Sequence, residues 1–553
     1  MLVIKNGRVY DPINGVKGEI RDIYIEGGKI VGKPEHIPKD TRSIDADGMI
    51  VMPGGIDMHA HIAGSKVNMG RKLCPEDHYE HFRIAERGLR SGVGSRVPTT
   101  FMTAYRYVEM GYTTVVEAAS APLVTRHTHE ELRDMPSVDK AILITMGNNE
   151  ILMDRISQGK IDEARDIVAW LLKSTGGYGV KVVNPGGVEN WKWGGNVESW
   201  DDEVRHFDIS SRKLINTLVA IVDELKLPHS VHLHGINLGL PGNADTTAEI
   251  IKDIPGRLHL CHLQFMSYGR NKKGGLRSDA WTVAEVLNGH PNVTMDVGQI
   301  VFGNAVTMTS DGPLEYRIQK MTGHKWCNDD VECETGGGIV PLEYKIKSVS
   351  SAVQWITGME LFLLTKDPWQ LALTTDHPNA GPFFCYPQVV RLLMDKDYRD
   401  HFISLLPPKA FRGSVLRELN REYTLYEIAI ITRAAPAKIL GLPEKGHLGI
   451  GADGDVAVYD PNQFGKRKCL CSFKPCRRAL DFPSWVIKGG EIVVRDGAIL
   501  RDIPGVVYRV NPSYDGLIED KIREDFERYY TLSFDSYPVQ EEYLKDAKGV
   551  ACQ

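Results

Sequence analysis

The stretch GGIDMHAHI, residues 54–62, contains two histidines separated by one residue. Side chains two positions apart on a β-strand point to the same side of it. His59 and His61 therefore face the same way near the end of a short strand. Two neutral imidazoles placed like this can hold one metal ion. An H-x-H pair by itself is more often an ordinary core or surface feature than a metal site, so its meaning depends on the other strands.

Outward from this strand, short apolar runs alternate with longer helical stretches over residues 52–437. We interpret eight runs as strands: GIDMHAHI (55–62), YTTVVEA (112–118), AILITM (141–146), GVKVVN (179–184), SVHLHG (230–235), RLHLCHL (257–263), NVTMDVG (292–298) and LALTTD (371–376). Between them, stretches such as 161–174 and 211–226 repeat apolar residues every three or four positions, which is typical of helices. Eight such units predict an α/β fold, a (β/α)8 TIM-type barrel with its site at the carboxyl ends of the strands. Two connections, 63–100 and 299–370, are long enough to become lids or substrate-binding walls.

The two ends of the chain share a sequence pattern that differs from that of the barrel region. Residues 1–51 and 438–504 contain short β runs separated by Gly/Asp turns, which predicts one small β-sandwich domain built from both ends. The segments KNGRVYD and KGGEIVVRDG are alike, and we expect them to be neighbouring strands of one sheet. Residues 505–553 form a charged, tyrosine-rich C-terminal extension to which we assign no chemistry.

The bulk composition excludes several classes of protein. A net charge of −6 over 553 residues argues against a nucleic-acid binder. The chain shows neither an apolar run of about 18 residues nor the apolar region of a signal peptide, so we expect a cytoplasmic protein without a membrane span. Its nine cysteines do not form a disulfide framework. The group Cys469, Cys471 and Cys476 matches no common iron–sulfur or zinc spacing, and we interpret it as plain thiols in or beside a strand.

Lys181, in YGVKVVNPGG, lies within an apolar strand where an unpaired ammonium is costly to bury. One solution is an ion pair with a carboxylate at the strand end. The other is reaction of the deprotonated amine with carbon dioxide, which gives a carbamate whose two oxygens can bridge two metals. The local sequence leaves both open.

Three further strands carry candidate ligands near their ends. His232 and His234 in SVHLHG share a face, whereas His259 and His262 in RLHLCHL are expected on opposite faces, with His262 the better candidate. Asp376, in LALTTDHP, ends the last strand with a carboxylate. It can cap the following loop, or it can bind a metal and take a proton from bound water.

This ordered set of residues resembles the amidohydrolase superfamily, and within it the dihydroorotase and hydantoinase branch. The resemblance implies two divalent metals, with zinc the expected element. The H-x-H pair would bind the more buried metal, a carboxylated lysine would bridge both, two histidines would hold the second, and the aspartate would complete the first site and act as acid and base. These roles fall on the following residues of this chain: His59, His61, Lys181, His232 or His234, His262 and Asp376. The family's H-A-E motif favours His232 over His234.

Longer segments, among them VHLHGINLGLPGN and TTDHPNAGPFFCYP, are similar to the amidohydrolase-type subunits of formylmethanofuran dehydrogenases and of the methylotrophs' formyltransferase/hydrolase complexes. That resemblance implies interconversion of formate plus methanofuran with N-formylmethanofuran, beside a tungsten or molybdenum subunit that reduces carbon dioxide. The stretch HIAG lacks the arginine that follows H-x-H in dihydroorotases, which disfavours a pyrimidine-ring substrate. A hydantoinase, an N-acyl-amino-acid hydrolase and a non-catalytic scaffold remain as alternatives.

Basic residues in two loops are candidates for binding the acidic tail of methanofuran, although a solvated loop or a contact with another protein of the complex explains them as well. They are Lys66, Arg71, Lys72, Arg270, Lys272 and Lys273.

Overall fold

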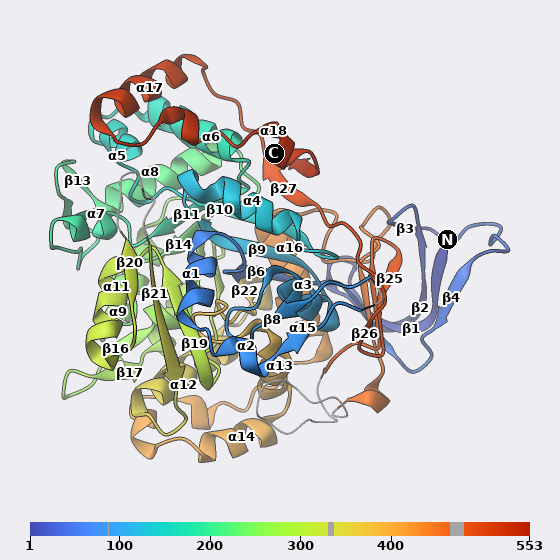
Figure 1. Ribbon diagram of the computed structural model, residues 1–553. Coiled ribbons are helices and arrows are strands. Elements are labelled where there is room, and N and C mark those ends of the chain that lie inside the picture. The colour runs from blue at the N-terminus through green and yellow to red at the C-terminus, as the bar shows by residue number, and fades with distance from the viewer. Residues whose placement is uncertain (87, 330–333, 335–336, 465–479, 553) are drawn as a thin grey trace.

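The computed structural model describes residues 1–553 except 87, 330–333, 335–336, 465–479 and 553, and its centre is a parallel barrel (Figure 1). The barrel strands are hydrogen-bonded in chain order: β6 (Gly55–Ala60), β9 (Tyr112–Ser120), β10 (Asp139–Thr145), β11 (Gly179–Val183), β14 (Val231–His234), β15 (Leu258–Leu260), β18 (Val293–Asp296) and β22 (Leu371–Ala372). A bridge from Ala60 to His377, and a 2.6 Å hydrogen bond donated by His61 N–H to the His377 carbonyl, bring the segment after β22 beside β6. The predicted (β/α)8 barrel is confirmed.

Most of the predicted strands end earlier in the structure than in the sequence interpretation, whereas β9 continues to Ser120, two residues beyond the predicted end. RLHLCHL provides only the three residues of β15, and LALTTD provides only the two residues of β22. His262 and Asp376 adopt left-handed backbone, with φ 36° and 45°, and so leave the pleated conformation. These two side chains therefore belong to the first loop residues beyond the strands, at the carboxyl-terminal end of the barrel.

Helices cover the outside of the barrel: α3 (Thr100–Glu109), α4 (Thr125–Arg133), α5 (Glu150–Ser157), α6 (Ile161–Thr175), α8 (Ser211–Glu224), α9 (Asn243–Asp253), α10 (Ala280–Leu287), α12 (Val349–Leu364), α13 (Tyr386–Met394), α14 (Lys396–Ser404) and α16 (Ala435–Leu440). α6 and α8 are the two helices expected from sequence periodicity. α6 starts with acidic Asp162 and Glu163, which suit the positive end of the helix dipole, and ends at Gly176 with φ 64°. Its buried side chains include Ile167 and Leu171, each worth about 1.5–3 kcal/mol on burial.

Strands from both chain ends form a single mixed sheet at one side of the barrel (Figure 1). Its members are β1 (Leu2–Asp11), β2 (Val16–Glu26), β3 (Lys29–Val31), β4 (Arg42–Asp45), β5 (Ile50–Pro53), β23 (Val456–Tyr459), β24 (Trp485–Lys488), β25 (Glu491–Arg495) and β26 (Ala498–Ile499). KNGRVYD and KGGEIVVRDG share this sheet but are not neighbours, because β5, β23 and β24 lie between β1 and β25. The sheet curls on itself: Ile30 N–H donates to the Ala452 carbonyl, and apolar side chains fill the inside.

A buried cluster of charges joins this end sheet to the barrel. The ammonium groups of Lys445 and Lys488 both contact the carboxylates of Asp139, on β10, and Asp455, next to β23. Asp139 also accepts a hydrogen bond from Val506 N–H at 2.9 Å, at the start of the C-terminal extension. Three parts of the molecule therefore meet at one carboxylate.

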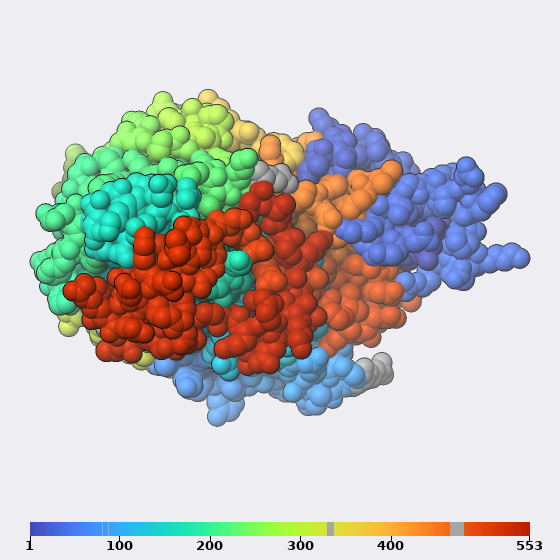
Figure 2. Space-filling view, turned by 90° about the horizontal axis from the view of Figure 1, so that it is seen from above, coloured from blue at the N-terminus to red at the C-terminus, as the bar shows by residue number. Residues whose placement is uncertain are grey.

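The C-terminal extension is part of the barrel sheet. β27 (Val507–Val510) pairs in parallel with the beginning of β10, and β28 (Ala547–Val550) pairs with β27. Between them, α17 (Leu517–Tyr529) packs near α6, where the rings of Phe534 and Trp170 stack 5.3 Å apart. Figure 2 shows the extension, in red, spread over one face of the molecule beside the teal residues of this region.

The two long connections meet each other above the barrel. The first contains α1 (Ser65–Leu73), and the second contains β19 (Gly303–Thr309), α11 (Gly312–Thr322), β20 (Cys327–Asp329) and β21 (Gly337–Tyr344). α1 packs against β19 and β21 through a small apolar cluster that includes Val67, Met308 and Ile339. Lys66 Nζ donates to Ser310 Oγ at 2.8 Å across the same contact. The connections thus form one wall beside the barrel mouth.

Over the described ranges, no helix combines the length and the apolar character needed to cross a membrane. Cys469, Cys471 and Cys476 lie outside the described residues.

Candidate metal centre

The side chains that the sequence nominated gather inside the carboxyl-terminal end of the barrel. Each is at most 5% exposed; they are His59, His61, Lys181, His232, His234, His262 and Asp376. Polar groups buried this deeply are stable only with partners or metal ions. Within the described residues, several sets of three donor atoms from this region lie within 4.8 Å of one another, as a metal ion requires.

His59, His61 and Asp376 form the first such set. Asp376 Oδ1 lies 3.1 Å from His59 Nε2 and 3.4 Å from His61 Nε2. Two ligands bound tetrahedrally to one zinc at 2.0–2.2 Å lie about 3.4 Å apart, so the observed spacing fits one shared ion. His59 Nε2 is buried and makes no well-aligned hydrogen bond, with the Asp376 carboxylate facing it at 3.1 Å, an arrangement that suits a shared metal ion.

Two carboxylates that the sequence interpretation missed orient this pair. Glu117, on β9, lies 3.3 Å from His61 Nδ1 and accepts Ile62 N–H at 2.7 Å. Asp296, at the end of β18, lies 3.1 Å from His59 Nδ1. Acidic residues behind metal-bound histidines fix the ring and its tautomer. Their signal in the sequence is an acid within or at the end of an otherwise apolar strand, in YTTVVEA and NVTMDVG.

His232 and His234 occupy different surroundings. Both ring nitrogens of His232 face other imidazoles, with His229 Nε2 at 3.0 Å and His59 Nδ1 at 2.9 Å. The ring of His234 lies 4.8 Å from that of His262, edge to face, and its Nε2 is 3.1 Å from Asp311 Oδ2. His232 is thus placed behind His59, and His234 beside His262.

His262 reaches the centre through its left-handed backbone rather than through strand alternation. The expectation that His259 and His262 face opposite ways is wrong: His259 Nε2 lies 3.2 Å from Asp296, and His262 is grouped with His59. Gly298 makes room for this turn, since a Cβ at position 298 would lie 2.5 Å from His262 Cβ. Gly298 itself has φ 63°, which L side chains rarely adopt.

Lys181 is 1% exposed, and its Nζ lies 2.9 Å from Cys261 Sγ. No carboxylate of the described residues pairs with it, which disfavours the ion pair considered from the sequence. Burial is the main cause that lowers the pKa of the imidazoles of His232, His234 and His262. The nearby amine of Lys181 lowers each of these pKa values further.

The electrostatics suit metal binding. Burial alone would raise the pKa of Asp376, but the imidazoles of His59 and His262 hold this pKa well below its usual value. Burial lowers the pKa of His262 well below its usual value. The carboxylate is therefore ionised and this imidazole neutral near pH 7, the states in which both bind metals. For His59, burial opposes the charged form, yet Asp296 and Asp376 raise its pKa, so metal binding there releases a proton.

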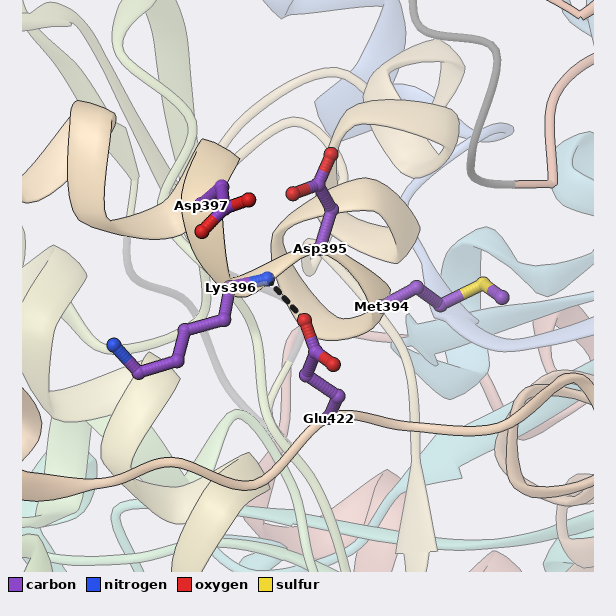
Figure 3. Close-up of a pocket in the computed structure, with 5 residues that line it drawn as sticks. All are labelled: Met394, Asp395, Lys396, Asp397 and Glu422. Carbon is purple, nitrogen blue, oxygen red and sulfur yellow. Dashed lines mark hydrogen bonds between the residues drawn. The ribbon is translucent and has the colours of Figure 1, made fainter.

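Two of the six basic loop residues are engaged elsewhere. Arg71 pairs with Glu131 at 3.1 Å, and Arg270 donates to the Pro241 carbonyl. Lys66 stands nearest the centre, because it lines the same small cavity as His61 and Glu117. A separate pocket at the junction of α13 and α14 is lined by Met394, Asp395, Lys396, Asp397 and Glu422, and a hydrogen bond from Lys396 N–H to Glu422 closes one side of it (Figure 3). None of the histidines of the centre lines that pocket.

Comparisons with known proteins agree with this architecture. The profile of the amidohydrolase family matches residues 42–494. Protein FwdA of Methanocaldococcus jannaschii is 45% identical, over 98% of this chain and 97% of its own length. One subunit of the formyltransferase/hydrolase complex Fhc of Methylorubrum extorquens is 36% identical, over 100% of this chain and 99% of its own length.

Solved structures point the same way. The crystal structure of the Methylorubrum extorquens formyltransferase/hydrolase complex with methylofuran contains a chain that matches with a TM-score of 0.92 and 34% identity, covering 100% of both chains. A dihydropyrimidinase from Brevibacillus agri shares the fold, with a TM-score of 0.52 at 14% identity over 93% of this chain and 98% of that one.

Proposed function

This chain belongs to the amidohydrolase family, a family of metal-dependent hydrolases, and from that membership we propose that it makes and breaks the C–N bond of N-formylmethanofuran. The observation that carries the proposal is the buried set of His59, His61 and Asp376 at ligand spacing, within a chain whose full-length relative belongs to a complex crystallised with methylofuran.

We assign the ligands as follows. His59, His61 and Asp376 would hold one metal, His234 and His262 would hold a second, and a carboxylated Lys181 would supply a ligand to both. His234 is preferred to His232 because both nitrogens of His232 face other histidines, whereas His234 lies beside His262. The burial of the Lys181 amine without a carboxylate partner supports the carbamate. Histidine-rich ligation supports zinc as the metal.

Two divalent metals bound in this centre would supply a hydroxide near neutral pH and polarise the formyl carbonyl. The ionised carboxylate of Asp376 is placed to take the proton of the attacking water and to return it to the leaving amine nitrogen. The formyl C–N bond breaks, and formate and the amine leave. In the opposite direction the amine attacks formate, the C–N bond forms, and water is lost, with Asp376 moving the same proton.

Glu117 and Asp296 support these steps without touching the substrate. They fix the rings of His61 and His59, and so hold the ligand nitrogens in place through the reaction.

The relatives also suggest the setting. In a formylmethanofuran dehydrogenase complex, a tungsten or molybdenum subunit would reduce carbon dioxide and pass formate to this centre. In a methylotroph-type complex, the same centre would release formate from the formylated cofactor. With either assignment we propose that the protein is cytoplasmic.

The test is formate release from N-formylmethanofuran, or from N-formylfurfurylamine as a smaller analogue, by the purified chain with zinc and bicarbonate. We expect release that is abolished by a chelator and restored by zinc. Hydrolysis of hydantoins or N-acyl amino acids in place of the formamide would keep the metal centre and overturn the substrate. If the isolated chain is inactive, the same assay is run on the native complex. Inactivity of the native complex would contradict the proposal.

A further inference from the structure

Cys261 is a buried thiol that the proposed reaction does not use. It follows β15, and its N–H donates to the Leu233 carbonyl at 3.0 Å, which continues the ladder between β14 and β15 by one residue. It lies two positions after His259, so both side chains point into the barrel. Cys261 is 0% exposed.

Two nitrogen atoms lie close to the sulfur of this thiol. Its Sγ lies 2.9 Å from Lys181 Nζ and 3.3 Å from His262 Nε2. A buried cysteine that serves only as a small apolar residue packs among hydrocarbon groups. Here the sulfur stands between two residues already assigned to the metal centre.

The spacing matches joint coordination. A zinc–sulfur bond of about 2.3 Å and a zinc–nitrogen bond of about 2.0–2.1 Å at the tetrahedral angle place the two ligand atoms about 3.6 Å apart. The sulfur of Cys261 and a ring nitrogen of His262 are separated by 3.3 Å. Donor atoms of His59, Cys261 and His262 lie within 4.8 Å of one another.

A second, independent observation points to a ligand at the same place. His262 Nδ1 is buried without a hydrogen-bond partner. An unpaired buried nitrogen is costly unless an ion satisfies it. It belongs to the histidine whose other ring nitrogen faces the thiol and which shares a donor set with it.

We propose that Cys261 Sγ is a ligand of the second metal, beside His262. The inference rests on the proposed function only in assuming that two metals bind. A thiolate is a soft ligand, which selects zinc and disfavours magnesium, calcium and manganese. Sulfur ligation would therefore set the identity of the metal, which histidines and a carbamate leave open. A cysteine that merely receives a hydrogen bond from Lys181 would not have this effect.

X-ray absorption at the zinc edge of the wild-type protein tests the proposal without any variant. We expect a sulfur scatterer at about 2.3 Å, at about one sulfur for every two zinc ions. Replacement of zinc by cobalt(II) should also give a thiolate-to-cobalt charge-transfer band in the near ultraviolet. In Cys261→Ser the band should fall to the level of the metal-free protein. The matched control is Cys74→Ser, which alters an equally buried thiol in the apolar cluster beside α1 and should leave the band intact.

Spectra that show only nitrogen and oxygen ligands in the wild-type protein would overturn the inference, as would a band that persists in Cys261→Ser. Formate release in the same preparations separates the two proposals. A protein without sulfur ligation that still releases formate refutes the role of Cys261 and keeps the proposed function. A zinc–sulfur signal without formate release supports the role of Cys261 and refutes the proposed function.

Discussion

Asp376 has two proposed roles, as a metal ligand and as the group that accepts and returns the proton. Replacing it by asparagine keeps the size of the side chain and one ligand oxygen but removes the proton acceptor. We expect Asp376→Asn to retain most of its metal and to lose about 10²–10⁴-fold or more in turnover, because it loses both base and acid. Metal analysis and formate release on the same sample measure the two effects. Near-normal turnover would contradict the mechanism.

Lys181 offers a test of the bridging carbamate. Lys181→Ala removes the amine that carbon dioxide would modify, so the second metal should bind weakly and turnover should fall. Acetate or propionate should restore part of both, because a free carboxylate can occupy the vacated space. Protein labelled with 13C-bicarbonate should show a carbamate carbon by NMR in the wild type and none in the variant. Full metal loading and activity of Lys181→Ala without added acid would refute the bridge.

At the scale of single residues, the sequence predicted the histidines, lysine and aspartate that meet, because each lies within or at the end of an apolar strand, where a polar side chain is conspicuous. It did not identify Glu117, Asp296 or Cys261. Their roles depend on which strand ends face one another across the barrel, and a single strand does not contain that information. The difference between His232 and His234 was unpredictable for the same reason.

The loop after β18 makes the position of His262 possible. Gly298→Ala would place a methyl group 2.5 Å from His262 Cβ and would impose a residue with a side chain on φ 63°. We expect the variant to fold, with a stability loss of at least about 1 kcal/mol from the strained backbone. His262 should be displaced, and the metal content should fall from about two ions to about one per chain. Metal analysis by mass spectrometry measures the change.

Gly289→Ala provides the matched control. Gly289 precedes β18 in the chain, whereas Gly298 follows it, and a Cβ at position 289 would meet only the Val286 carbonyl, at 3.4 Å. This substitution should leave metal content unchanged. Equal metal content in both variants would show that Gly298 does not position His262.

The elements themselves were largely predictable. Eight apolar runs gave eight barrel strands, and α6 and α8 lie where periodicity placed them. The ends of the strands were not predictable, because His262 and Asp376 leave the pleat through left-handed backbone that no periodicity reveals. Those same departures aim both side chains into the centre.

The charge cluster at Asp139 links the end sheet, the barrel and the C-terminal extension. Burial would raise the pKa of Asp139, but Lys488 and Lys445 lower it below its usual value. A carboxyl whose pKa is depressed by folding stabilises the folded protein above its unfolded pKa of about 3.9, and this contribution is lost as the pH falls further towards the folded value. Asp139→Asn leaves two buried ammonium groups with less compensation, and should cost about 3–5 kcal/mol at pH 7.

Urea unfolding at pH 7 and below pH 4 measures this contribution. The difference between wild type and Asp139→Asn should be large at pH 7 and should shrink at the acidic value. Asp40→Asn, at an exposed loop position, is the control and should change stability at neither pH. A difference that stays constant with pH would show that the effect of the substitution is not the loss of this charge.

Contacts across the whole chain were the least predictable. The sequence indicated one domain from both ends, but it placed KNGRVYD beside KGGEIVVRDG, whereas β5, β23 and β24 separate β1 from β25. It gave residues 505–553 no structural part, although β27 and β28 extend the barrel sheet. Pairings between segments hundreds of residues apart leave no local periodicity.

The pairing of β5 with β23 also has a consequence for synthesis on the ribosome. Residues 50–53 emerge long before residues 456–459, with which they form adjacent strands. At roughly 5–20 residues per second, the nascent edge waits roughly 20–80 s for its partner. An open, apolar strand edge invites pairing with other chains during that time. Yield of the native protein in a heterologous host should therefore depend on chaperones that shield the amino-terminal strands until translation has passed β23.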